Sequence, residues 1–180
     1  MLTIGHSTLP INIFLAALRE CGCSTLVDVR SIPRSRRNPQ YEQPALFAEL
    51  ERAGIRPIWR KGLGGLRRPR PDSVNGAWRN ESFRGYADYM QTPEFAGEIE
   101  WLMGLPHFDG VAVMCAESVP WRCHRSLIAD AVLARGGAVE DIFVTTQGRT
   151  SIKPHSLTSF ARVQDGRVWY PGEPVLFGSD

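Results

Sequence analysis

Apolar residues recur along the chain in short runs that alternate with longer stretches at helical spacing. The short runs, several of them rich in β-branched residues, predict strands at residues 2–5, 25–29, 55–59, 111–115 and 141–145. The longer stretches, bounded in places by Pro and Gly, predict helices at residues 11–18, 44–53, 83–90, 93–103 and 125–135. Because strands alternate with helices, we predict an α/β fold with a mostly parallel sheet and helices on both of its faces.

The C-terminal part of the chain has a different pattern. Short apolar stretches at residues 160–163 and 168–170 flank Asp165-Gly166, a pair typical of a type I′ hairpin. We therefore expect a single α/β domain over residues 1–150. Residues 151–180 form a C-terminal extension whose hairpin packs on that domain.

The amino-acid composition is that of a globular protein and not of a disordered or membrane-spanning one. The chain has 180 residues, of which 43% are hydrophobic and 22% charged, as in globular domains. Its longest apolar run, residues 111–115, is far shorter than the ~20 residues of a membrane span. The first residues lack the basic and apolar regions of a secretory signal, and the four cysteines are unevenly spaced. We expect a cytoplasmic protein with reduced thiols and no membrane association.

Positive charge is concentrated in residues 30–84, which hold 13 Lys+Arg and 5 Asp+Glu although the net charge is only +2. Tyr41, Trp59 and Trp78 lie among these cations. Cations beside flat aromatic rings suit a single-stranded nucleic acid or a nucleotide base. The same composition also fits a solvated Arg-rich loop whose aromatic residues pack on the core.

Polar and reactive side chains follow three of the predicted strands. Ligands of open α/β sheets bind outside the carboxyl ends of the strands. The side chains expected at this edge are His6, Ser7, Asp28, Arg30, Ser35, Cys115, Glu117, Cys123, His124 and Arg125. Since the guanidinium group of arginine matches phosphate and carboxylate, Arg30 and Arg125 are expected to hold an anion, either a small molecule or a nucleotide.

Residues 115–125 leave three interpretations open. Cys115, Cys123 and His124, with His6, could bind zinc. Cys115 could instead be a nucleophilic thiolate in a strand–loop–helix cradle, or Glu117 or His124 could act as a general acid–base. Adjacent side chains such as Cys123 and His124 point apart in a strand or at the start of a helix, and no paired ligand spacing is present. We therefore expect no metal and no cofactor.

Six short segments together resemble one family. They are TIGHS at residues 3–7, DVR at residues 28–30 followed by Pro33 and Ser35, LGG at residues 63–65, Tyr86-Ala87, CAE at residues 115–117 and CHRS at residues 123–126. In this order they resemble the uncharacterised bacterial domain-of-unknown-function 488 family, from the N-terminus to about residue 144. The resemblance implies a single α/β domain and no established activity.

A looser likeness, to rhodanese-like domains, would place a persulfide on Cys115. The segment after Cys115 is longer than in that pattern, contains Glu117 and Pro120, and lacks the usual Gly. We therefore expect Cys115 not to be a conventional sulfur-transfer nucleophile.

The leading hypothesis is an enzyme, or a former enzyme, that binds a phosphate-bearing or other anionic ligand at the carboxyl edge. The expected catalytic residues are His6, Asp28, Cys115 and Glu117. The expected ligand-binding residues are Ser7, Arg30, Ser35, Tyr86, His124 and Arg125. The alternatives are a non-catalytic nucleic-acid-binding module that uses residues 30–84 and rhodanese-like sulfur transfer at Cys115.

Overall fold

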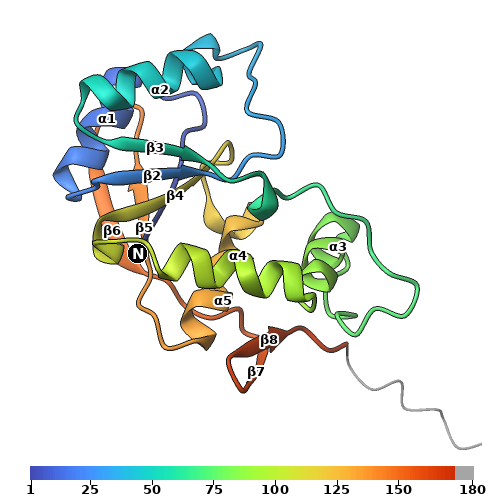
Figure 1. Ribbon diagram of the computed structural model, residues 1–180. Helices are drawn as coiled ribbons and strands as arrows, with labels where there is room; N and C mark the ends of the chain where they lie inside the picture. Colours follow the sequence, from blue (N-terminus) through green and yellow to red (C-terminus); the bar gives the residue numbers. More distant parts are fainter. Residues whose placement is uncertain (173–180) are drawn as a thin grey trace, which may run out of the picture.

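The computed structural model describes residues 1–172 and contains a central six-stranded sheet (Figure 1). The strand order is β3-β2-β4-β1-β5-β6. The strands are β1 (Leu2–Gly5), β2 (Thr25–Asp28), β3 (Arg56–Trp59), β4 (Val111–Cys115), β5 (Glu140–Val144) and β6 (Thr150–Pro154). Strands β1 to β5 pair in parallel, and β6 runs antiparallel to β5. The predicted α/β class with a mostly parallel sheet is confirmed.

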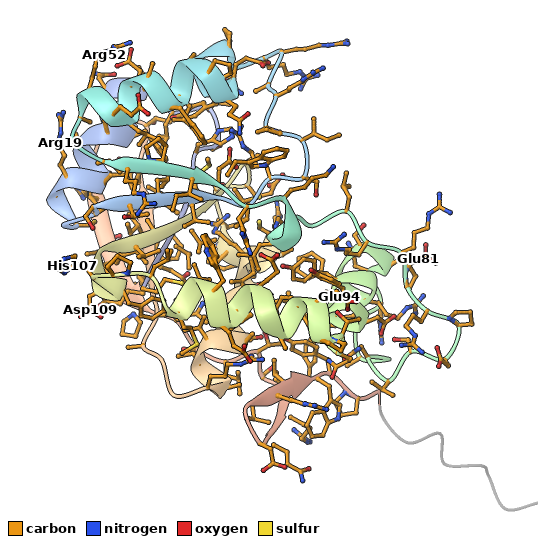
Figure 2. All side chains as sticks on the ribbon, viewed as in Figure 1. Arg19, Arg52, Glu81, Glu94, His107 and Asp109 are labelled. Carbon is orange, nitrogen blue, oxygen red and sulfur yellow. The ribbon has the colours of Figure 1, made fainter. Side chains whose placement is uncertain are left out.

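Helices lie on both faces of this sheet, as Figure 1 shows. They are α1 (Ile11–Glu20), α2 (Gln43–Arg52), α3 (Glu81–Tyr89), α4 (Pro93–Met103) and α5 (Arg125–Ala134). Helices α1 and α2 pack on one face, and α4 and α5 pack on the other, together with part of α3. Charged side chains such as Arg52 and Glu81 point away from these layers (Figure 2).

The alternation of side chains along β4 divides the core in two. Val111, Val113 and Cys115 belong to the core under α4 and α5. Ala112 and Met114 belong to the core under α1 and α2. A strand that is buried on both faces has to be apolar throughout, and all five residues of β4 are buried. The same alternation decides which face each residue near the carboxyl edge can reach.

The predicted elements are all present, with ends that shift by one or two residues, and one strand was missed. The sequence TSIKP of β6 has no apolar run, because this edge strand is largely exposed. Strand β6 pairs with β5 so that Thr150 lies opposite Val144 and Pro154 lies opposite Glu140. The central sheet therefore extends four residues past residue 150, the expected end of the α/β domain. The last eight residues of the expected extension, 173–180, lie outside the described part of the chain.

The predicted hairpin is confirmed. Strands β7 (Arg162–Gln164) and β8 (Arg167–Trp169) are antiparallel. Asp165 has a φ of 51° and Gly166 a φ of 73°, the positive values that a type I′ turn requires at both central positions.

A buried polar cluster connects residues 155–170, the segment that contains this hairpin, to helix α5. Asp130 of α5 is fully buried and accepts hydrogen bonds from His155 Nε2 (3.3 Å), the Thr158 amide (3.1 Å) and the Tyr170 hydroxyl (2.8 Å). His155 Nδ1 donates to Asp141 of β5 at 2.8 Å. Burial alone would lower the pKa of His155, but the hydrogen bonds and charges of Asp130 and Asp141 raise it from 6.5 to about 9.

This raised pKa predicts a pH dependence of stability. Charged His155 stabilises the fold fully below about pH 6.5, the unfolded pKa, and this stabilisation is lost as the pH rises through about 9, the folded pKa. Thermal unfolding of the wild type between these pH values should therefore show a falling melting temperature that His155→Gln lacks. Parallel curves for the two proteins would contradict the assigned charge.

Within residues 1–172, no helix is long and apolar enough to cross a membrane.

Candidate functional site

A cavity of about 480 Å³ opens at the carboxyl ends of β2 and β4. Its lining includes four residues predicted for the site, which are Arg30, Cys115, Glu117 and His124. The lining also includes Cys123, which was expected at this edge, and three residues that were not expected to take part in the site, Arg34, Leu66 and Arg122. This is the edge at which an open α/β sheet is expected to bind its ligand.

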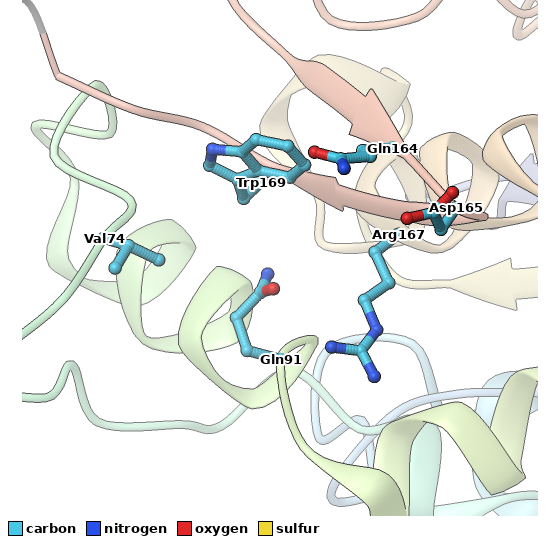
Figure 3. A pocket seen from close by; sticks show the side chains of 6 residues that line it. All are labelled: Val74, Gln91, Gln164, Asp165, Arg167 and Trp169. Carbon is cyan, nitrogen blue, oxygen red and sulfur yellow. The ribbon is translucent and has the colours of Figure 1, made fainter.

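A larger cavity, of about 590 Å³, lies between the β7–β8 hairpin and the region of α3 (Figure 3). Val74, Gln91, Gln164, Asp165, Arg167 and Trp169 line it. Among the described residues, no cysteine, histidine or predicted site residue lines it. The chemistry of the side chains, and not the volume, therefore points to the smaller cavity.

Two thiols and an imidazole meet at this cavity. Cys115 ends β4, and Cys123 and His124 immediately precede α5. The Sγ atoms of Cys115 and Cys123 and one ring nitrogen of His124 all lie within 4.8 Å of one another, and Cys123 Sγ is 3.7 Å from His124 Nδ1. The expectation that Cys123 and His124 point apart is wrong, because Cys123 is extended (φ −138°, ψ 142°) whereas His124 has helical angles (φ −57°, ψ −16°).

The orientation of the His124 ring is fixed from two sides. Its Nε2 lies 3.2 Å from the carbonyl oxygen of Val29, which can only accept a hydrogen bond, so Nε2 carries the proton. Nδ1 is then the ring nitrogen that faces the thiols, 3.7 Å from Cys123 Sγ. The ring lies next to Tyr86, with ring centroids 5.0 Å apart, and a Cβ atom on Gly65 would overlap Nδ1. The LGG segment therefore provides the space that the ring occupies.

The two thiols have opposite pKa shifts. The hydrogen bond from Cys123 holds the pKa of Cys115 well below its usual range against the effect of burial, with further contributions from His124 and a backbone hydrogen bond at Glu117. Burial and the neighbouring Cys115 thiolate raise the pKa of Cys123. The arrangement therefore favours ionisation of Cys115 over ionisation of Cys123.

Arg30 belongs to a second cluster on the opposite face of the sheet. Asp28 is fully buried and Arg30 is 5% exposed. Arg30 donates to both carboxylate oxygens of Asp28, at distances from 2.6 to 3.1 Å, and to the carbonyl oxygen of Tyr41 at 2.9 Å. Its remaining contact is with His6 Nε2 at 3.4 Å. The guanidinium group is thus held by the protein itself, although Arg30 still contributes to the wall of the cavity.

His6 is buried in this second cluster. Its Nδ1 donates to the carbonyl oxygen of Ser7 at 2.8 Å, and its ring stacks on Tyr41 with centroids 4.0 Å apart. Burial lowers the pKa of His6 to about 4, so the ring is neutral at pH 7. Neutral His6 can accept a hydrogen bond from Arg30, which makes it a positioning group for that side chain in this structure.

Arg125 is 1% exposed and holds the loop that follows β4. Its guanidinium group donates to the carbonyl oxygens of Glu117 and Ser118. A Cβ atom on Gly5 would overlap the same carbonyl group of Glu117, so glycine is what allows this loop to cross the end of β1. The side chain of Glu117 itself is exposed at the rim of the cavity.

The other predicted ligand-binding residues serve local contacts in this structure. The Ser35 hydroxyl accepts from the Asn38 amide at 3.2 Å. Tyr86 is fully buried behind His124, and its hydroxyl donates to Leu63. Ser7 has a φ of 46° in the turn after β1. Whether these residues contact a ligand stays a prediction.

The fold and the cavity define an α/β protein with a dithiol–imidazole cluster at the carboxyl edge of its sheet. The family described as "Domain of unknown function DUF488" matches residues 10–132, about two thirds of the chain, and the chain belongs to this family. The matched region contains the cluster and Arg30, and leaves out His6 and the segment that carries the hairpin. A search of the curated proteins and a search of the solved structures found no match.

Proposed function

We propose that the protein is an enzyme that binds a small anionic ligand, such as a phosphate-bearing molecule or a nucleotide, in the 480 Å³ cavity. The observation that carries this proposal is that Cys115, Cys123 and His124 meet in a cavity with two exposed arginines, Arg34 and Arg122, in its lining. Sulfur and imidazole groups supply reactivity, and free guanidinium groups bind anions with directed hydrogen bonds.

The residues take different parts in this proposal. Arg34 and Arg122 bind the anion, because their side chains are exposed whereas Arg30 and Arg125 are already occupied by acceptors of the protein. Cys115, Cys123 and His124 form the part of the cavity wall at which the ligand reacts. The Glu117 carboxylate at the rim of the cavity exchanges protons with the bound ligand. Asp28 and His6 act through Arg30.

The contacts of the basic segment support a small ligand over a nucleic acid. Several of its arginines are engaged within the protein: Arg60 with Glu98 and Trp101, Arg67 with Tyr89, Arg70 with Asp72, and Arg84 with Glu81. Two of its three aromatic residues are also engaged, since Tyr41 is buried and Trp78 stacks on Phe83. Trp59 donates to the Arg30 carbonyl and is the one ring of the three that is exposed, at 38%. A single-strand binding surface requires exposed rings on which bases can stack.

Calorimetric titration with inorganic phosphate and with a mononucleotide tests the proposal. We expect saturable binding that weakens about tenfold or more in an Arg34→Ala/Arg122→Ala double variant, since one hydrogen bond to a charged group contributes about 1.5–3 kcal/mol. Arg36→Ala/Arg37→Ala is the matched control, because these two arginines are exposed on the same loop as Arg34 but do not line the cavity.

Two results would contradict the proposal. One is binding of a single-stranded oligonucleotide with a steep salt dependence and no saturable binding of phosphate, which would support the nucleic-acid alternative. The other is thiosulfate:cyanide turnover that Cys115→Ser abolishes, which would support sulfur transfer.

A further inference from the structure

We infer that Cys115, Cys123 and His124 form a binding site for a thiophilic divalent metal ion of the zinc class. In tetrahedral zinc sites, Zn–S bonds of about 2.3 Å and Zn–N bonds of about 2.0 Å place neighbouring donor atoms about 3.5–3.8 Å apart. Cys123 Sγ and His124 Nδ1 are 3.7 Å apart, and all three donor atoms lie within 4.8 Å of one another. One ion can therefore reach the three donors with little rearrangement.

The imidazole already has the orientation that a ligand needs. A metal-bound histidine usually donates its second ring nitrogen to a carbonyl or carboxylate, which fixes both the tautomer and the ring. His124 makes this contact through Nε2 to the carbonyl oxygen of Val29, and its Nδ1 is the nitrogen next to Cys123 Sγ. Gly65 leaves room for the ring in this orientation, because a Cβ atom there would overlap Nδ1.

Charge and hydrogen bonding favour a cation at this place. Cys115 is 7% exposed and Cys123 is 3% exposed, so two bare thiolates side by side would be costly. A divalent cation between them balances both negative charges. The Arg125 amide donates to Cys123 Sγ at 3.5 Å, a hydrogen bond that also supports a sulfur ligand.

The site has three protein donors and a cavity. Among the described residues, the cluster contains no fourth histidine, cysteine or carboxylate ligand. Three protein ligands with an open position are typical of catalytic zinc sites, whereas closed structural sites use four. The remaining position faces the cavity in which Arg34 and Arg122 lie, so water or an oxygen of an anionic ligand can occupy it and be polarised there. The assignment of an anionic ligand to the open position rests on the proposed function.

Titration of the reduced, metal-free full chain with Co²⁺ tests the inference. We expect one equivalent to produce thiolate-to-cobalt charge-transfer absorption and ligand-field bands of tetrahedral intensity, and Zn²⁺ to displace it. Cys115→Ala, Cys123→Ala and His124→Ala should each weaken binding at least about tenfold. Cys21→Ala and Cys23→Ala are the controls, because both cysteines lie on the α1 side of the fold and should leave the spectrum unchanged.

A second variant separates ligand loss from misfolding. Gly65→Ala places a methyl group against His124 Nδ1, so it should weaken Co²⁺ binding about tenfold or more while the protein still unfolds cooperatively. Gly97→Ala is its control, because a Cβ atom there meets no neighbouring atom within 4 Å.

Absence of thiolate-to-cobalt absorption in the reduced wild type would overturn the inference, as would cobalt binding that survives Cys115→Ala or His124→Ala. Purification of the protein with a Cys115–Cys123 disulfide that forms equally well in the presence of excess zinc would also overturn it. If the protein binds phosphate but not Co²⁺, the metal site is rejected and the proposed function stands. If it binds Co²⁺ but not phosphate or a nucleotide, the proposed function is rejected and the metal site stands.

Discussion

Replacing Arg30 by methionine is expected to lower the free energy of unfolding by about 3–5 kcal/mol, because it leaves the carboxylate of Asp28 buried without a cation. Asp28 is fully buried at the end of β2. Burial raises its pKa, and the hydrogen bonds and charge of Arg30 oppose that rise. The variant also removes the donor to the Tyr41 carbonyl.

Urea denaturation followed by circular dichroism measures this loss. Arg70→Met is the matched control, because its ion pair with Asp72 is exposed on both sides and should leave the unfolding midpoint unchanged. The double variant Asp28→Asn/Arg30→Met should be more stable than Arg30→Met, since it removes the unpaired charge. Equal midpoints for Arg30→Met and Arg70→Met would show that the Asp28–Arg30 pair does not support the fold.

Replacing Asp130 by alanine is expected to be comparably destabilising, at about 3–5 kcal/mol. Asp130 has no exposed surface and accepts hydrogen bonds from the side chain of His155, the amide of Thr158 and the hydroxyl of Tyr170. All three donors belong to the segment that follows β5. Their loss should detach this segment from α5 as well as lower overall stability.

Hydrogen exchange and denaturation together measure the effect. In Asp130→Ala, amides of β7 and β8 should exchange faster than those of β1 and β4. Tyr170→Phe removes only one of the hydrogen bonds and should cost about 0.5–1.5 kcal/mol. If the two variants lose the same stability, Asp130 is not the centre of this network.

The fold was predictable from the sequence because its strands and helices differ in apolar spacing. Strand β4 is apolar at every position, and α4 begins at Pro93 as the proline predicts. Strand β6 could not be found in this way, since Thr150–Pro154 is held by pairing with β5 and not by burial of its side chains.

The sequence predicts where the candidate site residues gather, but not how their side chains are oriented. Residues that follow parallel strands do gather at one edge, but the alternation of side chains sends Cys115 to the α4–α5 face and Asp28 to the other face. The position of His124 beside the thiols depends on a change of backbone conformation between two adjacent residues. Arg125 was expected to hold an anion. Its hydrogen bonds to the carbonyl oxygens of Glu117 and Ser118 depend on tertiary contacts, which cannot be predicted from a local sequence pattern.

Anomalous diffraction at the zinc edge, from crystals grown with zinc and inorganic phosphate, tests the central claim most directly. We predict a single strong peak between Cys115 Sγ, Cys123 Sγ and His124 Nδ1, with a phosphate oxygen on the open side of the ion near Arg34 and Arg122. A site without anomalous density, with phosphate bound away from the cavity, would contradict the assignment of the carboxyl edge as the functional centre.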